Sequence, residues 1–173
     1  MKSFSILFTL LALANPVFAV DATASKKGDD CTLNFESITA LINSKSDQLS
    51  HYGSIAKDST AKIQIETAVL SNGVMVVSTS GGCAHLGQSL SYSAPSIKSD
   101  KQAVETAIKY LKATPATGYG NSVKITWVSA LENWLKSPTS SNFKVINLGK
   151  GDATITLNYD VMGLLKIDYS FAL

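Results

Sequence analysis

The hydrophobic positions between residues 34 and 49 recur at helical spacing. Asn34 is a suitable N-cap, and the apolar residues that follow it lie three, four or seven positions apart: Phe35, Ile38, Leu41, Ile42 and Leu49. On a helix this spacing forms one apolar stripe that packs against a core, while residues 44–47 face water. The pattern predicts a first helix over residues 34–49.

Residues 61–93 alternate between apolar and polar positions, which is typical of strands. Ile63, Ile65 and Val69 alternate with Gln64 and Glu66, so we predict a strand over residues 61–70 whose polar side faces water.

Two more strands follow this one. Asn72-Gly73 is a strong hairpin sequence, and the continuous apolar run in residues 74–78 predicts a strand covered on both sides. Residues 85–93, with Leu90 and Tyr92 on one face, predict the third strand of an antiparallel meander.

Two amphipathic helices are predicted beyond Pro95. Ser99 and Gln102 have the spacing of a capping box, and the apolar stripe behind them consists of Val104, Ala107, Ile108 and Leu111. A second helix should start near Asn121 or Ser122 and end before Pro138. Its apolar face carries Trp127 and Trp134, which we expect in the core. Residues 143–148, 153–159 and 164–173 alternate again and predict a second meander.

These elements predict an α+β protein, with antiparallel meander sheet or sheets and amphipathic helices packed on one face. Their order also fits two helix-plus-three-strand units, residues 31–95 and 96–173, although no repeat is visible at the level of residues. In element order the chain resembles small exported inhibitors of hydrolases that are built from helix-and-meander units, such as the β-lactamase inhibitory proteins. The resemblance implies a protein that binds an enzyme.

The N-terminus has the features of a secretory signal peptide. Lys2 gives a positive start, residues 4–13 are mostly apolar, and Val17-Phe18-Ala19 suits cleavage after Ala19. We predict a signal peptide over residues 1–19, a flexible lead-in over 20–30 and a single compact domain over 31–173. Because no other apolar run is long enough to span a bilayer, we expect a periplasmic or secreted protein that is not inserted in a membrane.

Composition narrows the classes of function. The sequence has 173 residues, and all fifteen of its basic side chains are lysines. Removing the signal peptide leaves fourteen basic against thirteen acidic side chains, a net charge of +1, which gives no strong attraction to polyanions. Without arginine the chain has no guanidinium fork to grip phosphate. We therefore expect no nucleic-acid partner.

The two cysteines predict one structural disulfide. Cys31 and Cys83 form an even pair in an exported chain, and closing the loop between them would stabilise the fold by about 4 kcal/mol. The alternative is a catalytic Cys83 with His85 as its base, but the motif contains no third group to orient the imidazole. His51 and His85 are the only histidines, and their spacing does not suggest a metal site.

Recognition is the function that the remaining residues favour. No nucleophile, base or carboxylate pair stands out, since the glutamates fall on the expected wet faces, and we predict no catalytic activity and no cofactor. Residues 81–87, which include Gly82, His85 and Leu86, would form a loop stiffened by the disulfide. Together with Tyr119 they are the candidate partner-binding residues. We predict an inhibitor or immunity protein that binds a cell-wall or secreted enzyme, such as a hydrolase or toxin. The alternative is a carrier of a small apolar ligand in a sheet-helix cavity lined by Trp127 and Trp134.

Overall fold

The computed structural model describes residues 38–53, 55–60, 62–82, 85–139, 145–148, 153–160 and 164–172. All of them lie in the unit Cys31–Leu173. The predicted signal peptide, the lead-in and the disulfide between Cys31 and Cys83 lie outside the described residues.

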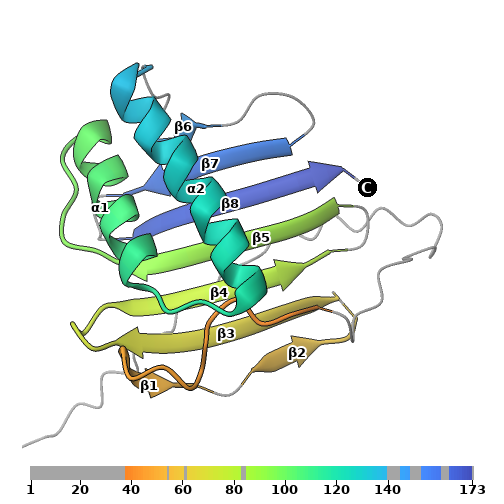
Figure 1. Ribbon diagram of the computed structural model, residues 1–173. Coiled ribbons are helices and arrows are strands. Elements are labelled where there is room, and N and C mark those ends of the chain that lie inside the picture. Colours follow the sequence, from red (N-terminus) through yellow and green to blue (C-terminus); the bar gives the residue numbers. More distant parts are fainter. Residues whose placement is uncertain are drawn as a thin grey trace, which may run out of the picture. The chain divides into compact units, whose positions relative to one another are not determined.

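The described residues form one antiparallel sheet of eight strands, and two helices follow the fifth strand (Figure 1). The strand order is β1-β3-β4-β5-β8-β7-β6, and the short β2 pairs with β3 beside this path. The bounds are β1 Leu49–Tyr52, β2 Ala56–Asp58, β3 Ile63–Leu70, β4 Met75–Gly81, β5 His85–Ser93, α1 Asp100–Ala113, α2 Gly118–Lys136, β6 Val145–Asn147, β7 Ala153–Tyr159 and β8 Leu164–Ala172. The predicted α+β class, with an antiparallel sheet, is confirmed.

The two helices begin at hydroxyl caps. At α1 the Ser99 hydroxyl accepts a hydrogen bond from the Gln102 N–H at 3.2 Å, while the Gln102 side chain accepts from the Lys98 N–H at 2.9 Å. At α2 the Thr117 hydroxyl accepts from the Gly120 N–H at 2.9 Å, so this helix begins about one turn earlier than predicted. No helix within the described residues is long and apolar enough to cross a membrane.

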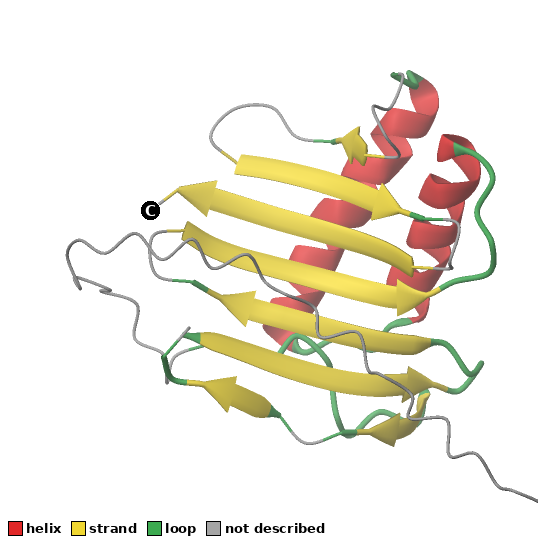
Figure 2. Ribbon diagram, turned by 180° about the vertical axis from the view of Figure 1, so that it is seen from behind, coloured by secondary structure: helices red, strands yellow, loops and turns green. Residues whose placement is uncertain are grey.

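Both helices lie on the same side of the sheet, as the two opposite views in Figures 1 and 2 show. The ring of Tyr92 on β5 contacts that of Tyr110 on α1, with centroids 5.5 Å apart. The Tyr92 hydroxyl also lies 3.0 Å from that of Thr114, which itself donates to the Tyr110 carbonyl at 2.8 Å. Because the Thr114 proton is used in this way, Tyr92 is the donor to Thr114.

The core consists of apolar side chains from this side of the sheet and from the helix stripes. Tyr92, Trp127 and Leu131 are fully buried, and Trp134 is 8% exposed. The expectation that both tryptophans belong to the core is confirmed.

The predicted first helix is wrong over the part that the structure describes. Residues 38–48 contain turns and an isolated bridge between Ile42 and Ala116, and Leu49 begins strand β1. Leu41 and Ile42 are buried, as the spacing implied. Their backbone N–H groups, however, donate to the side chain of Glu66, which lies far away in the sequence and replaces the hydrogen bonds that a helix would supply.

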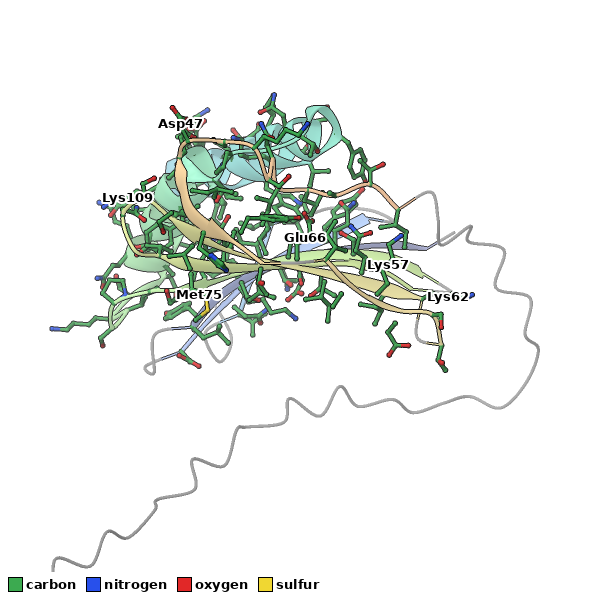
Figure 3. The ribbon with its side chains drawn as sticks, turned by 90° about the horizontal axis from the view of Figure 1, so that it is seen from below. Asp47, Lys57, Lys62, Glu66, Met75 and Lys109 are labelled. Atoms are coloured by element: carbon green, nitrogen blue, oxygen red, sulfur yellow. The ribbon has the colours of Figure 1, made fainter. Side chains whose placement is uncertain are left out.

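The predicted orientation of β3 is also wrong. Gln64, Glu66, Ala68 and Leu70 are its buried residues, whereas Ile65 on the opposite side is 38% exposed. Strand β4 was expected to be covered on both sides, but its Met75 is 52% exposed. Figure 3 shows Glu66 on the helix side of the sheet and Met75 on the other side. Both errors have one cause, because no second layer of described residues covers the side that carries Ile65 and Met75.

Strands β3 to β5 and β6 to β8 form two successive meanders, as the alternation predicted. They join where β5 pairs with β8, from His85 opposite Ala172 to Ser93 opposite Leu164. The result is one continuous sheet. In the described residues no helix precedes the first meander, so the first half differs from the predicted helix-plus-three-strand unit.

Candidate functional site

Polar side chains are buried on the helix side of β3, β4 and β5. Gln64, Ser80 and Gln88 lie opposite one another on the three strands, and Glu66 and Ser78 form the next pair along. All five are buried. Polar groups that are buried away from water need hydrogen-bond partners. The partners of Glu66 and Gln88 show which parts of the chain this cluster holds together.

Glu66 uses both carboxylate oxygens. Its Oε2 accepts from the Leu41 N–H at 2.7 Å, and its Oε1 accepts from the Ile42 N–H at 3.3 Å and from the Tyr52 hydroxyl at 3.0 Å. Burial, together with the charge of Glu66 and this hydrogen bond, raises the pKa of Tyr52 well above its usual value. The phenol therefore stays protonated and remains a donor to Glu66. These contacts make Glu66 an internal anchor for the chain.

Residues 40–43, here called the anchored segment, are also held from the other side by the connection between α1 and α2. The Thr117 hydroxyl donates to the Ala40 carbonyl at 2.7 Å, and the Thr117 N–H donates to the Leu41 carbonyl at 3.0 Å. The Asn43 N–H donates to the Pro115 carbonyl at 3.0 Å. The anchored segment thus links Glu66 on β3 to the beginning of α2.

Gly120 lets the beginning of α2 pack closely against the anchored segment. A Cβ atom at position 120 would lie 2.1 Å from the Leu41 carbonyl oxygen, which is far inside contact distance. A Cβ at Gly118, one position before Tyr119, would meet nothing within 4 Å. The sequence Gly118-Tyr119-Gly120 therefore contains one glycine that packing requires, and the fixed position of Gly120 also fixes its neighbour Tyr119.

Tyr119 connects the buried cluster to the surface. Its side chain is 43% exposed, yet its hydroxyl accepts a hydrogen bond from Nε2 of the buried Gln88. A tyrosine with a free side chain would sample several rotamers. Here the bond to Gln88 and the position of the helix start favour one orientation of the ring, with part of its surface in solvent.

The end of β4 and the residue after it, Gly81 and Gly82, lie at the same end of the sheet. Gly81 and Gly82 have φ values of 137° and 126°, and the Gly82 N–H donates to the Lys62 carbonyl at 3.1 Å. A Cβ at Gly81 would lie 2.0 Å from this carbonyl oxygen. Lys62 itself has a φ of 54°, an uncommon conformation for a residue other than glycine. Lys62, directly before β3, and Gly82, directly after β4, are therefore joined at this end.

The structure gathers the four predicted partner-binding residues at this end of the sheet. Gly82 precedes the turn, and His85 and Leu86 begin β5, where they pair with Ala172 and Phe171 of β8. Tyr119 contacts Gln88, two residues further along β5. The side chains of His85 and Leu86 lie outside the described residues.

The burial of three polar residues behind this surface was not predicted from the sequence: Gln64, Glu66 and Gln88. Glu66 was assigned to a wet face because a charged residue that alternates with apolar ones is usually exposed. Ala68 and Leu70 lie two and four positions after Glu66, so they point to the same face of the strand. These two apolar residues were the one indication in the sequence that this face is buried.

The described residues offer limited means for other chemistry. Among them, no three His, Cys, Asp or Glu side chains lie close enough together to hold a metal ion. Gln64 Nε2 and the hydroxyls of Ser78 and Ser80 are buried without a hydrogen-bond partner within the same part of the chain. They are neutral groups that suit ordered water, which commonly satisfies such atoms.

Comparison of the chain with protein-family models, with curated proteins and with solved structures found no match in any of the three.

Proposed function

We propose that the protein is exported and acts by binding another protein, as an inhibitor or immunity protein directed against a cell-wall or secreted enzyme. The binding surface is the end of the sheet that carries Tyr119 and the β4–β5 turn. The observation that carries this proposal is the half-exposed ring of Tyr119, held by the buried amide of Gln88.

A fixed aromatic side chain suits protein recognition for an energetic reason. Binding a partner costs the entropy of every side chain that becomes ordered, about 0.5–1.5 kcal/mol for a flexible one. Tyr119 is already ordered in the free protein, so it can contribute its contact area at a lower entropic cost. Gly82, directly after β4, donates to the Lys62 carbonyl, which fixes a second backbone position at this end of the sheet.

The proposed binding surface belongs to an α+β protein whose helices cover one face of the sheet. Its two meanders are proposed to be related halves. The pairing of β5 with β8, the last strand of each meander, supports that relation. Among the described residues, Ile65 and Met75 on the other side of the sheet are also exposed, but they are apolar and have no polar tether such as that of Tyr119.

The alternative, carriage of a small apolar ligand between sheet and helices, receives less support from the two tryptophans. Trp127 is fully buried against other core side chains. Trp134 borders a groove, but more than half of the residues that line this groove are polar.

Two variants of α2 test the proposed surface. The mature protein, with an affinity tag, is used to capture partners from the periplasmic extract of its own source, and the captured enzyme is then purified and titrated by calorimetry. Tyr119→Ala should weaken binding at least about tenfold, since buried aromatic anchors contribute 2 kcal/mol or more. Ile125→Ala is the matched control, because Ile125 is an apolar residue six positions along the same helix and is even more exposed than Tyr119, and this variant should leave the affinity unchanged.

Three results would contradict the proposal. A captured enzyme whose affinity is the same for Tyr119→Ala and the wild type would exclude this surface. A partner whose activity is unaffected by saturating protein would exclude inhibition. Export predicts that the intact mass of the protein corresponds to residues 20–173, and a mass that still includes residues 1–19 would exclude cleavage of the signal peptide.

A further inference from the structure

A groove of about 350 Å³ lies between the second half of α2 and the strands β6 and β7. Its lining residues are Thr126, Ser129, Ala130, Asn133, Trp134, Thr139, Asn147, Leu148 and Ile155. Figure 1 shows α2 crossing the sheet toward β6, the edge strand that bounds this groove. The volume is at the lower end of the range for small-ligand sites. The groove is separate from Tyr119, which lies in the first turn of the helix.

None of the lining residues that the structure describes is charged. A phosphate, carboxylate or ammonium ligand in such a groove would lose hydration without gaining an opposite charge, which is unfavourable. The lining therefore favours a neutral ligand. An entirely apolar ligand fits equally poorly, because it would cover the hydroxyl and amide groups of Ser129, Asn133 and Asn147 without replacing their hydrogen bonds to water.

Several of these polar groups have unused hydrogen-bonding capacity. Within the described residues, no hydrogen bond engages the Ser129 hydroxyl or the Asn147 side-chain amide. Asn133 accepts from Lys136 Nζ at 3.3 Å through Oδ1, which leaves its Nδ2 group as a donor. The Thr139 hydroxyl accepts from the Trp134 indole N–H at 3.2 Å and retains its own proton. The groove thus offers both donors and acceptors, all uncharged.

The remaining lining is apolar and contains an indole. Trp134 is 8% exposed, and Leu148 and Ile155 continue the apolar wall onto the sheet. A pyranose ring has the matching character, with C–H groups on its faces and hydroxyls around its rim. Trp134 can pack against the C–H groups while Ser129, Asn133 and Asn147 bond to the hydroxyls.

We propose that this groove is a binding site for a neutral sugar unit, with Trp134 as its apolar wall and Ser129, Asn133 and Asn147 as its hydrogen-bonding groups. The site does not depend on the protein-binding surface at Tyr119. Loss of either one leaves the other testable.

The two tryptophans allow a site-specific test by NMR. The protein has two indole N–H groups, one at Trp134 beside the groove and one at the buried Trp127, and Trp134→Phe assigns their signals. The probes are tri-N-acetylchitotriose and maltotriose, two neutral sugars with and without acetamido groups, each titrated to about 10 mM, where even millimolar affinity is visible. Either sugar should shift the Trp134 signal saturably and leave that of Trp127 in place. Failure of both sugars to cause a saturable shift at Trp134 would overturn the proposal.

Variants then localise the binding. Asn147→Ala should raise the Kd about five- to tenfold, the effect of losing one good hydrogen bond. Ser129→Phe should abolish binding by filling the groove. Asn121→Ala is the matched control, because it removes an exposed amide from the same helix outside the groove, and it should bind like the wild type. All variants are compared by thermal denaturation, since positions 121, 129 and 147 are exposed and should tolerate substitution.

The last experiment compares a charged sugar with a neutral one. Glucuronate should bind at least about tenfold more weakly than glucose, because none of the described lining residues is charged and the Lys136 ammonium is already bonded to Asn133 Oδ1. Equal binding of the two sugars would contradict a neutral-ligand site. Unchanged sugar affinity of Ser129→Phe would show that the sugar binds elsewhere and would overturn the assignment of this groove.

Discussion

The carboxylate of Glu66 accepts a hydrogen bond from the backbone N–H of Leu41 at 2.7 Å, across 25 positions of sequence. The same side chain accepts from the Ile42 N–H and from the Tyr52 hydroxyl. This one buried acid therefore determines the path of the anchored segment, and the anchored segment holds the first turn of α2 in place. The position of Tyr119 is consequently linked to a residue on the far side of the buried cluster.

Removal of the Glu66 carboxylate should be strongly destabilising. Glu66→Ala leaves the Leu41 and Ile42 N–H groups buried without an acceptor, so we expect the free energy of unfolding to fall by about 3–5 kcal/mol. Glu66→Gln keeps the volume but turns an NH₂ group toward one of these donors, and it should also destabilise. Urea denaturation measures both effects.

The control for this prediction is Glu105→Ala. Glu105 is exposed on α1 and lies 3.9 Å from Lys101, an ion pair whose loss should change stability by less than about 0.5 kcal/mol. A Glu66→Ala protein as stable as the Glu105→Ala protein would show that Glu66 does not anchor residues 40–43.

The two glycines around Tyr119 should respond to alanine in opposite ways. Gly120→Ala places a Cβ 2.1 Å from the Leu41 carbonyl oxygen, so the helix start or the anchored segment must shift, and we expect a loss of about 2 kcal/mol or more. Gly118→Ala meets open space and should leave stability unchanged or raise it slightly. Thermal denaturation of the pair separates the packing effect from helix propensity. Equal losses would argue against the close approach at Gly120.

The strand pattern was predictable because it is local. The bounds of β7, residues 153–159, agree with the alternation, and the cap of α1 at Ser99 follows from residues that are neighbours in sequence. The sequence could not show which side of β3 is buried. Alternation identifies two faces, and the choice between them depends on the donors at Leu41, Ile42 and Tyr52 that make burial of Glu66 tolerable.

The same distinction applies to the two candidate sites. Tyr119 and the β4–β5 turn were identified from loop composition, which is a property of short segments. The groove was missed because Asn133 and Asn147 belong to different elements and meet only after α2 has crossed the sheet. Helical spacing placed Trp134 in the core. It could not show that Trp134 also borders a groove lined by neutral polar groups.

The stability of the protein should fall as the pH rises above about 10. Burial raises the pKa values of Tyr92 and Tyr52 in the folded state, with the nearby charge of Glu66 adding to the effect at Tyr52. Above the ordinary tyrosine pKa of about 10, the unfolded chain therefore releases protons that the folded protein retains, which favours unfolding. The stabilising contribution is complete below pH 10 and is lost above it.

Phenylalanine variants separate the titration of these tyrosines from that of the lysines, because the variants and the wild type have the same lysines. At pH 7, Tyr52→Phe and Tyr92→Phe should each cost about 1 kcal/mol through the lost hydrogen bond to Glu66 or Thr114. Above pH 10 the double variant should lose stability less steeply than the wild type in urea denaturation. Parallel curves at every pH would contradict the assignment to these two tyrosines.

Cys31 and Cys83 should form a disulfide in the exported protein. The oxidised chain should be lighter than the reduced one by two hydrogen atoms, and proteolysis without reductant should release the two cysteine peptides joined. Replacing both residues by serine should lower the free energy of unfolding by about 2–5 kcal/mol, because the loop between them is no longer closed in the unfolded state. Reduction of the wild type should have a similar effect, whereas the serine variant should not respond to reductant. If both thiols of the purified exported protein react with iodoacetamide before reduction, the crosslink is absent, and the alternative of a reactive Cys83 beside His85 gains support.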